Sequence, residues 1–309
     1  MMRVGAYRSE AMLIVAAAIW GFAFVAQVAG MEHVGPFTFN AARFVLGGLS
    51  LIPLLIILPR LQRVAPAKPK AKGLLLGSCL AGFFLFAGAS LQQVGLQYTT
   101  AGKAGFITGL YIILVPMFAL CWGQRAEAKI WFGAALCVIG LFYLSVREDF
   151  TVSYGDSLQL IGAGFWAGHV LMIGWLSPRF NPLHISILQF LVCGVVSWIV
   201  AFAVETPTWS GLWGASWSIA YAGFMSVGIA YTLQVIGQQH APATRVAIII
   251  SLETVFAVLG GWLLLQEVLD EKAIYGCGLM LAGMIVSQLN FNRGRTRERK
   301  LLDSGAAGS

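Results

Sequence analysis

The sequence predicts an all-α integral membrane protein whose ten transmembrane helices form two inverted repeats of five helices. Three observations support this prediction. Of the 309 residues, 58% are hydrophobic and only 11% are charged, whereas about a quarter are charged in an ordinary soluble domain. Long apolar segments recur along the chain, and its two halves resemble each other. A soluble domain needs a charged surface, so lipid is expected to replace water over much of this one.

Ten segments have the length and composition of membrane spans, which are stretches of about 17 to 25 residues with few charges. The apolar run after Arg3 and Arg8 continues to Ala29, so an uncleaved first helix is expected instead of a signal peptide. No connection is long enough for a soluble domain. The predicted spans are residues 11–29, 37–58, 73–94, 104–123, 130–146, 158–177, 182–204, 213–234, 246–266 and 273–291.

The placement of Lys and Arg predicts the orientation. The N-terminus, the even-numbered loops and the C-terminal tail carry 16 of the 20 basic residues, and the odd-numbered loops carry 3. By the positive-inside rule, both termini are expected to face the cytoplasm. The predicted location is the cell (inner) membrane. The net charge of +7 is concentrated near residues 60–72 and 293–300 without interleaved aromatic residues. It is therefore interpreted as a topology signal, and no nucleic-acid partner is expected.

The cysteines indicate no metal or cofactor. All five lie in apolar segments and none forms a CxxC pair, so they are interpreted as small hydrophobic residues of helices. The expected partners are a small-molecule substrate, the lipid bilayer and protons, with the protein acting as a monomer or a homodimer.

The two halves align at offsets of 146, 142 and 143 residues along the chain. They divide the chain into residues 1–149, residues 150–292 and a basic cytoplasmic tail, 293–309. Each half holds five predicted spans, an odd number, so the second half is inverted relative to the first. Inverted repeats are typical of secondary transporters, which predicts a carrier. The aligned pairs include Trp20 with Trp166, Pro36 with Pro182, Phe44 with Phe190, Lys103 with Arg245, Gly133 with Gly276 and Gly140 with Gly283.

Several motifs carry a resemblance to a known family: Ala18-Ile19-Trp20-Gly21, Arg43-Phe44, Gly105-Phe106-Ile107-Thr108-Gly109-Leu110-Tyr111, His240-Ala241-Pro242-Ala243 and Ser251-Leu252-Glu253. In their order and spacing they resemble the EamA type of the drug/metabolite transporter superfamily, over nearly the whole chain. The resemblance implies two EamA-like repeats, a central cavity and export of amino acids, other metabolites or drugs. The chain departs from the family pattern in carrying Thr254 where proline is common.

Two charged residues lie deep in predicted spans, where a charge is costly and faces protein or water. Arg43 is interpreted as a contact for an anion or carboxylate, as part of a structural pair or as a donor to helix-end carbonyls. Glu253 is interpreted as a proton-coupling carboxylate, as a contact for a substrate ammonium, as a partner of Arg43 or as the cap of a broken helix. His169 is a candidate proton carrier, and its alternative role is that of a hydrogen-bonded histidine inside the bundle.

Other intramembrane side chains complete the predicted substrate cavity. Trp20 and Trp166 lie at mid-span, where packing or cavity walls explain tryptophan better than the interfacial belt does. Gln92, Tyr111 and Tyr231 are polar residues within spans, and the alternative role of such residues is hydrogen bonding between helices. With His169 and Glu253, these residues form the predicted substrate cavity. Glu253, Arg43 and His169 are the candidates for ion coupling or for a structural pair.

Two other classes of function compete with the secondary transporter. A membrane-embedded, lipid-modifying enzyme usually gathers acids or histidines in a recognisable motif, and the sequence contains no HExxH, DDxxD or GxxxxGK[ST]. No catalytic residue is therefore predicted. A channel or structural subunit normally needs a polar path through the membrane, for which one Arg and one Glu within the spans are too few.

Overall fold

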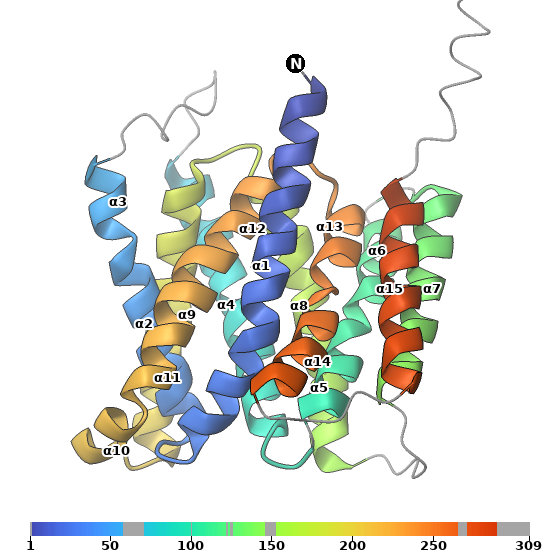
Figure 1. Cartoon of the computed structure of the whole chain (residues 1–309). Helices are drawn as coiled ribbons and strands as arrows, with labels where there is room; N and C mark the ends of the chain where they lie inside the picture. Colours follow the sequence, from blue (N-terminus) through green and yellow to red (C-terminus); the bar gives the residue numbers. More distant parts are fainter. Residues whose placement is uncertain are drawn as a thin grey trace, which may run out of the picture.

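The computed structural model describes residues 2–57, 71–99, 101–121, 123, 126–145, 153–264 and 271–288, and every regular element within them is a helix. The helices cross one bundle in alternating directions (Figure 1). The start of α1 and the end of α15 lie at the same face, the upper one in Figure 1. We call it the N-terminal face and the opposite one the far face. The basic tail predicted at 293–309 lies outside the described residues.

The two halves of the chain contribute helices in the same order. The first half contains α1 (Met2–Met31), α2 (Pro36–Ser50), α3 (Ile52–Ile57), α4 (Ala71–Gly95), α5 (Ala101–Gly109), α6 (Tyr111–Cys121) and α7 (Ala128–Ser145). The second half contains α8 (Tyr154–Leu176), α9 (Pro182–Val204), α10 (Trp209–Gly214), α11 (Ser216–Ala220), the π-helix η2 (Tyr221–Tyr231), α12 (Thr232–Gly237), α13 (Ala243–Ile250), α14 (Glu253–Leu264) and α15 (Glu271–Gln288).

The bundle has the composition and length of a multi-pass membrane protein. Seven helices are long and apolar enough to cross a bilayer. Three shorter apolar helices, Ile107–Cys121, Ala128–Gly140 and Ile274–Ser287, lie at the fourth, fifth and tenth predicted spans. These lengths refer to the described part of the chain only. They establish many membrane-crossing helices, and the number ten stays a prediction.

The helices at the fourth and ninth predicted spans are each interrupted near their middle. The fourth is interrupted at Leu110, between α5 and α6, and the ninth at Ser251 and Leu252, between α13 and α14. At the second break the Ser251 hydroxyl donates to the carbonyl of Ile248 at 2.8 Å. Such a bond competes with the regular ladder of the helix. At the first, Leu110 donates its backbone N–H to Ile107, in a tighter turn than that of an α-helix.

The eighth span also differs from the single regular helix predicted at 213–234. A short helix, α10, precedes it, and eleven of its residues, Tyr221–Tyr231, form a π-helix. The exposed side chains of Trp209, Trp213 and Trp217 recur every four residues in α10 and α11 at the far face. Tryptophan favours the boundary between lipid and water, so this segment suits the membrane interface.

Polar side chains begin helices at both faces of the bundle. Ser153 and Asp156 form a capping box at the start of α8, and Asn181 caps α9 at the N-terminal face. The cap of α2 comes from the other half of the chain. The Glu205 carboxylate accepts the backbone N–H groups of Phe37 and Thr38, both at 2.8 Å. A negative charge at a helix N-terminus is favourable, so this contact ties the two halves together at the far face.

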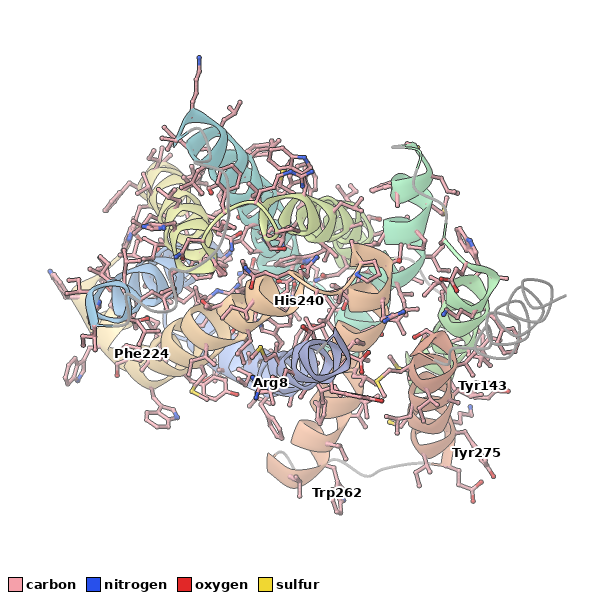
Figure 2. The ribbon with its side chains drawn as sticks, turned by 90° about the horizontal axis from the view of Figure 1, so that it is seen from above. Arg8, Tyr143, Phe224, His240, Trp262 and Tyr275 are labelled. Carbon is pink, nitrogen blue, oxygen red and sulfur yellow. The ribbon has the colours of Figure 1, made fainter. Side chains whose placement is uncertain are left out.

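Glycines allow α7 and α15 to pack closely. A Cβ atom on Gly133 would lie 2.7 Å from the carbonyl oxygen of Gly283, and one on Gly140 would lie 2.6 Å from that of Gly276. Both distances are shorter than any side chain tolerates, so backbone packs directly on backbone here. The contact joins equivalent helices of the two halves. Figure 2 shows this pair at the edge of the bundle, with Tyr143 and Tyr275 at its rim.

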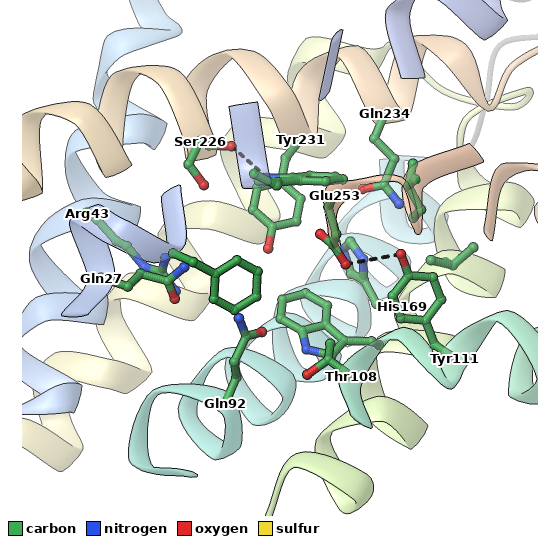
Figure 3. A pocket seen from close by; sticks show the side chains of 15 residues that line it. Gln27, Arg43, Gln92, Thr108, Tyr111, His169, Ser226, Tyr231, Gln234 and Glu253 are labelled. Carbon is green, nitrogen blue, oxygen red and sulfur yellow. Dashed lines mark hydrogen bonds between the residues drawn. The ribbon is translucent and has the colours of Figure 1, made fainter. Parts of the chain in front are cut away.

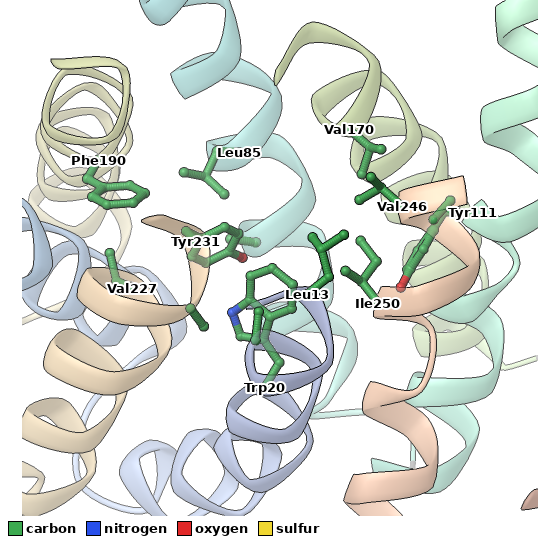
Figure 4. Close-up of a cluster of buried hydrophobic side chains, with 14 of the residues drawn as sticks. Leu13, Trp20, Leu85, Tyr111, Val170, Phe190, Val227, Tyr231, Val246 and Ile250 are labelled. Carbon is green, nitrogen blue, oxygen red and sulfur yellow. The ribbon is translucent and has the colours of Figure 1, made fainter. Parts of the chain in front are cut away.

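The outer surface is apolar and the centre is filled. Large hydrophobic side chains are exposed around the perimeter, including Phe224 and Trp262, which extend from the rim in Figure 2. In water such a surface would aggregate, whereas in lipid it is the expected one. The largest cluster of buried apolar side chains lies between the two halves and includes Leu13, Trp20 and Phe190 (Figure 4). It borders the cavity described next.

Candidate functional site

A cavity of about 50 Å³ lies at the centre of the bundle. It has room for a few water molecules and is far smaller than the roughly 300–1,000 Å³ of pockets for drug-sized ligands. Its walls come from both halves of the chain and consist of Trp20, Phe24, Gln27, Arg43, Gln92, Thr108, Tyr111, Trp166, His169, Val170, Ser226, Tyr231, Gln234, Ile250 and Glu253.

The structure brings all the candidate residues of the sequence to this one cavity. Trp20 comes from α1, Arg43 from α2, Gln92 from α4 and Tyr111 from α6, whereas α8 supplies both Trp166 and His169. Tyr231 and Glu253 complete the set, from the end of η2 and the start of α14 (Figure 3). Their joint placement is a geometric finding, and their roles in binding or coupling stay predictions.

Tyr231 lies between the two equivalent tryptophans. Its ring centroid is 4.6 Å from that of Trp20 and 6.3 Å from that of Trp166, the latter with planes only 17° apart. The indole N–H of Trp20 donates to the backbone carbonyl of Ser226 at 3.2 Å, within the π-helix. In contrast, the indole nitrogen of Trp166 is buried without a hydrogen-bond partner among the described residues. Aromatic faces thus form much of the wall, which suits flat or apolar molecules.

Glu253 and Tyr111 meet across the cavity. The Tyr111 hydroxyl donates to one carboxylate oxygen of Glu253 at 3.2 Å. Each residue begins the second segment of a broken helix, Tyr111 in α6 and Glu253 in α14. The offset of 142 makes them equivalent positions of the two halves, so the contact joins matching helix ends. A carboxylate at the first turn of a helix is also stabilised by the free N–H groups there.

Arg43 is buried and does not pair with Glu253, which corrects one of the structural explanations offered for both residues. Its Nε donates to the Oδ1 of Asn40 at 3.0 Å, and its guanidinium lies 4.9 Å from the centroid of the Phe44 ring. Among the described residues, no carboxylate lies within 4.0 Å of it. Arg43 and Glu253 instead face the cavity from different sides (Figure 3).

His169 is held by a neighbour. Its Nε2 lies 2.8 Å from the Oε1 of Gln189, and its ring meets the rings of Trp166 and Tyr231 edge-on. An amide oxygen only accepts hydrogen bonds, so the imidazole carries its proton on Nε2 in this contact. The hydrogen-bonded histidine proposed as the alternative from the sequence is therefore present, although the ring still lines the cavity.

The sequence interpretation missed several wall residues that the repeat offsets identify. Adding 146 to Phe24 gives Val170, and adding 142 to Thr108 gives Ile250; both members of each pair line the cavity. The same offset relates Gln92 to Gln234. Applying the offsets to every intramembrane residue, instead of only to Trp, Pro and basic residues, would have found them. Gln27 and Ser226 have no such signal.

The two ends of the cavity differ in polarity at one matched position. Towards the far face, Gln159 donates to the carbonyl of Gln92 at 2.9 Å and accepts from the Thr108 hydroxyl at 3.1 Å. Towards the N-terminal face, Leu13, Val170 and Ile250 belong to one apolar cluster (Figure 4). Leu13 and Gln159 are equivalent at the offset of 146. The same structural position is thus polar at one end and apolar at the other.

The cavity residues can bind charged and aromatic groups, and they do not form a metal centre. No group of three His, Cys, Asp or Glu side chains that could hold a metal ion occurs within the described part of the chain. The fold and site together define a multi-pass membrane protein with a partly charged cavity at its centre, lined by residues of both halves of the chain.

The comparisons with known proteins give the family. A model of the EamA-like transporter family matches residues 8–146 and again 153–288. A protein of Archaeoglobus fulgidus named as an uncharacterized transporter is 30% identical over 90% of this chain and 84% of its own. The chain belongs to the EamA-like transporter family. It is thus a membrane transporter and not an enzyme, with a small-molecule substrate and a lipid environment.

More distant relatives include another named membrane transporter and a solved structure that shares the fold. The inner membrane transporter YedA of Escherichia coli is 23% identical over 88% of this chain and 87% of its own. A chloroplastic WAT1-related protein of Arabidopsis thaliana is 23% identical over 89% of this chain and 67% of its own. A solved crystal structure superposes with a TM-score of 0.74, covering 91% of this chain and 96% of its own at 18% identity, which supports the fold.

Proposed function

We propose that the protein is a secondary active exporter that carries small metabolites, such as amino acids or amphipathic compounds, out of the cell through the inner membrane. The observation that carries this proposal is the central cavity, where equivalent residues of the two halves meet around charged side chains. Two halves of inverted topology can exchange conformations and open one site to each side in turn. The two ends of the cavity, one beside Gln159 and the other beside Leu13, would then be the two gates.

The proposal includes the topology. Residues 1–149 and 150–292 form two five-helix repeats with ten transmembrane helices, and residues 293–309 form a basic cytoplasmic tail. The family match on either side of residues 147–152 supports this division. Arg8, Arg179 and Arg245 belong to the N-terminal face, which supports cytoplasmic termini under the positive-inside rule.

Proton exchange drives the export in this proposal, with Glu253 as the carrier and His169 as a second candidate. Glu253 is the acidic residue that lines the cavity, and a carboxyl group within a membrane protein alternates between its charged and neutral forms when the cavity opens to water. Substrate and proton then use the cavity in turn. The coupling needs one carboxylate with access to both faces.

A transport assay with a matched control tests the proposal. A thermal-shift screen of the purified protein against small metabolites first identifies a substrate. In proteoliposomes, its flux should follow an imposed pH gradient, and Glu253→Gln should remove that dependence and slow coupled flux by at least about tenfold. Glu32→Gln, at an exposed acid of the far face, should behave like the unaltered protein. If flux ignores the gradient and Glu253→Gln transports normally, proton coupling through Glu253 is wrong.

A further inference from the structure

The terminal nitrogens of Arg43 are an unfilled hydrogen-bonding group in the centre of the bundle. Arg43 is 4% exposed, and its one hydrogen bond among the described residues uses Nε. A guanidinium has five N–H donors in a planar fork and no acceptor. The two terminal nitrogens, which form the carboxylate-binding end of the fork, therefore have donors available on the cavity side.

The neighbouring rings do not replace a counter-charge. Phe44 and Phe39 lie close to the guanidinium, whose central carbon is 4.9 and 5.5 Å from their ring centroids. A cation–π contact stabilises the charge through the ring face, but a ring supplies no lone pair to an N–H donor. Neither ring accepts the terminal N–H groups in their own plane. The hydrogen-bonding requirement of those groups is left for a ligand or water.

Two other arginines of the described residues have partners of kinds that Arg43 lacks. Arg179 also lies 4.9 Å over an aromatic ring, that of Trp175, but it is solvent-facing and donates through Nη1 to the Trp175 carbonyl. Arg245 lies 3.9 Å from the carboxylate of Glu10. Arg43 has neither a carbonyl nor a carboxylate among the described residues.

In the second half of the chain, the residue equivalent to Arg43 is uncharged. Adding 146 to Arg43 gives Gln189, whose amide oxygen is used within the protein by His169. A neutral amide with an internal partner is therefore sufficient at this place in the bundle. The arginine of the first half is not required by the architecture alone.

Arg43 is held in position for binding. Asn40 accepts from its Nε and itself donates to the carbonyl of Ala89 at 3.2 Å, so the amide is fixed from both sides. On the other side of Phe44 lies Tyr231, with ring centroids 6.2 Å apart. The Tyr231 hydroxyl points into the cavity (Figure 3) and makes no hydrogen bond to a described residue. One fork of N–H donors and one O–H donor thus face the same space.

We infer that Arg43 binds the carboxylate of the transported substrate, and that the substrate class is a small organic carboxylate with an apolar or aromatic body. Paired N–H donors of a guanidinium match the two oxygens of a carboxylate. Trp20 and Trp166 offer flat apolar surface to the body of the molecule. Glu253, which also lines the cavity, repels a second negative charge and so disfavours dicarboxylates. The inference rests on the proposed transport function.

Three compounds of one shape test the inference: 3-phenylpropionate, which has a carboxylate; phenethylamine, which has an amine; and phenylalanine, which has both. Binding to the purified full-length protein is followed by tryptophan fluorescence, and uptake is measured in proteoliposomes. We expect both carboxylates to bind. Arg43→Gln, which installs the residue of the equivalent position, should weaken them by about tenfold or more. Arg179→Gln is the matched control and should leave their binding unchanged.

The outcomes separate the inference from the transport function. Carboxylate binding that is equal in the unaltered protein and in Arg43→Gln, or binding of phenethylamine alone, overturns the inference. The absence of binding by either carboxylate up to its solubility limit does the same. Arg43-dependent binding without uptake supports the inference and contradicts the transport function. If Arg43→Gln does not fold, Arg43→Lys keeps the charge and loses the paired geometry, and carboxylate binding should again weaken.

Discussion

At the crossing of α7 and α15 the two halves carry the same residue at equivalent positions, whereas around the cavity they carry different ones. Gly133 and Gly140 correspond to Gly276 and Gly283, and all four make the backbone contact between the helices. At the cavity, Tyr111 corresponds to Glu253 and Arg43 to Gln189. Identical glycines at the helix crossing keep the packing of the two halves symmetric. Different residues at the equivalent cavity positions give the cavity charged groups, which a symmetric pair of apolar residues could not supply.

The two ends of the cavity show the same contrast at one matched position. A Cβ atom on Gly95 would lie 2.6 Å from Gln159, and a Cβ atom on the equivalent Gly237 would lie 3.0 Å from Leu13. Both glycines therefore contact the side chain of the facing helix in the same way. Gly95 contacts an amide that makes two hydrogen bonds, and Gly237 contacts an aliphatic side chain. The packing is repeated in the two halves, whereas the polarity of the packed side chain is not.

The largest expected effect comes from breaking the shared contact. Gly283→Leu places a side chain against the Gly133 carbonyl and the Cys137 sulfur, where a Cβ alone would be 2.6 and 2.7 Å away. We expect destabilisation of about 3 kcal/mol or more, because overpacking moves both helices. Gly278→Leu, in the same helix with nothing within 4 Å of its Cβ, should be close to neutral. Thermal unfolding in detergent measures both, and equal losses would contradict the proposed role of the contact.

An exchange of the end residues should have an intermediate effect and should sharpen the comparison of the two faces. Leu13→Gln buries an amide among apolar neighbours at a cost of about 1–3 kcal/mol, and it should weaken the closure of the N-terminal face. Gln159→Leu removes two hydrogen bonds and should weaken the far face instead. A single cysteine introduced by Ser226→Cys, in a background without the native cysteines, reports access.

Impermeant thiol reagents added to each side measure that access. Faster labelling from the N-terminal side in Leu13→Gln, and from the far side in Gln159→Leu, is expected. The same change in both variants would mean that the two residues do not act as separate closures.

The smallest expected effect concerns the paired tryptophans. Trp20→Phe loses the hydrogen bond to the Ser226 carbonyl, which stabilises by about 1 kcal/mol. Trp166→Phe loses no hydrogen bond to a described residue and should leave the unfolding temperature nearly unchanged. The two variants are matched in volume, so their difference in stability isolates the hydrogen bond. Equal losses would show that packing alone holds both rings.

Much of the site was predictable because intramembrane polar residues are few. Arg43, Glu253 and His169 stood out by their cost in lipid, and Trp20 and Trp166 by their equivalent places in the repeat. All lie on one cavity. The partner of Arg43 was predictable as well, because Asn40 lies three residues before it in the same helix. The partner of His169 was not, because Gln189 lies in another helix, and whether the two meet depends on how the helices rotate about their axes.

Composition, apolar segments and the repeat determined the class of the protein. The cost of exposing polar backbone and charge to lipid depends on each residue type, so it can be assessed from the sequence alone. The family followed from the motifs. Only the tertiary structure decided that the fourth and ninth helices break where Tyr111 and Glu253 meet. It also decided that Arg43 has no carboxylate partner among the described residues, and that Gln159 bonds to Gln92 and Thr108. The contacts of Tyr111 with Glu253 and of Gln159 with Gln92 join residues 142 and 67 positions apart, and they exist only once helices have packed.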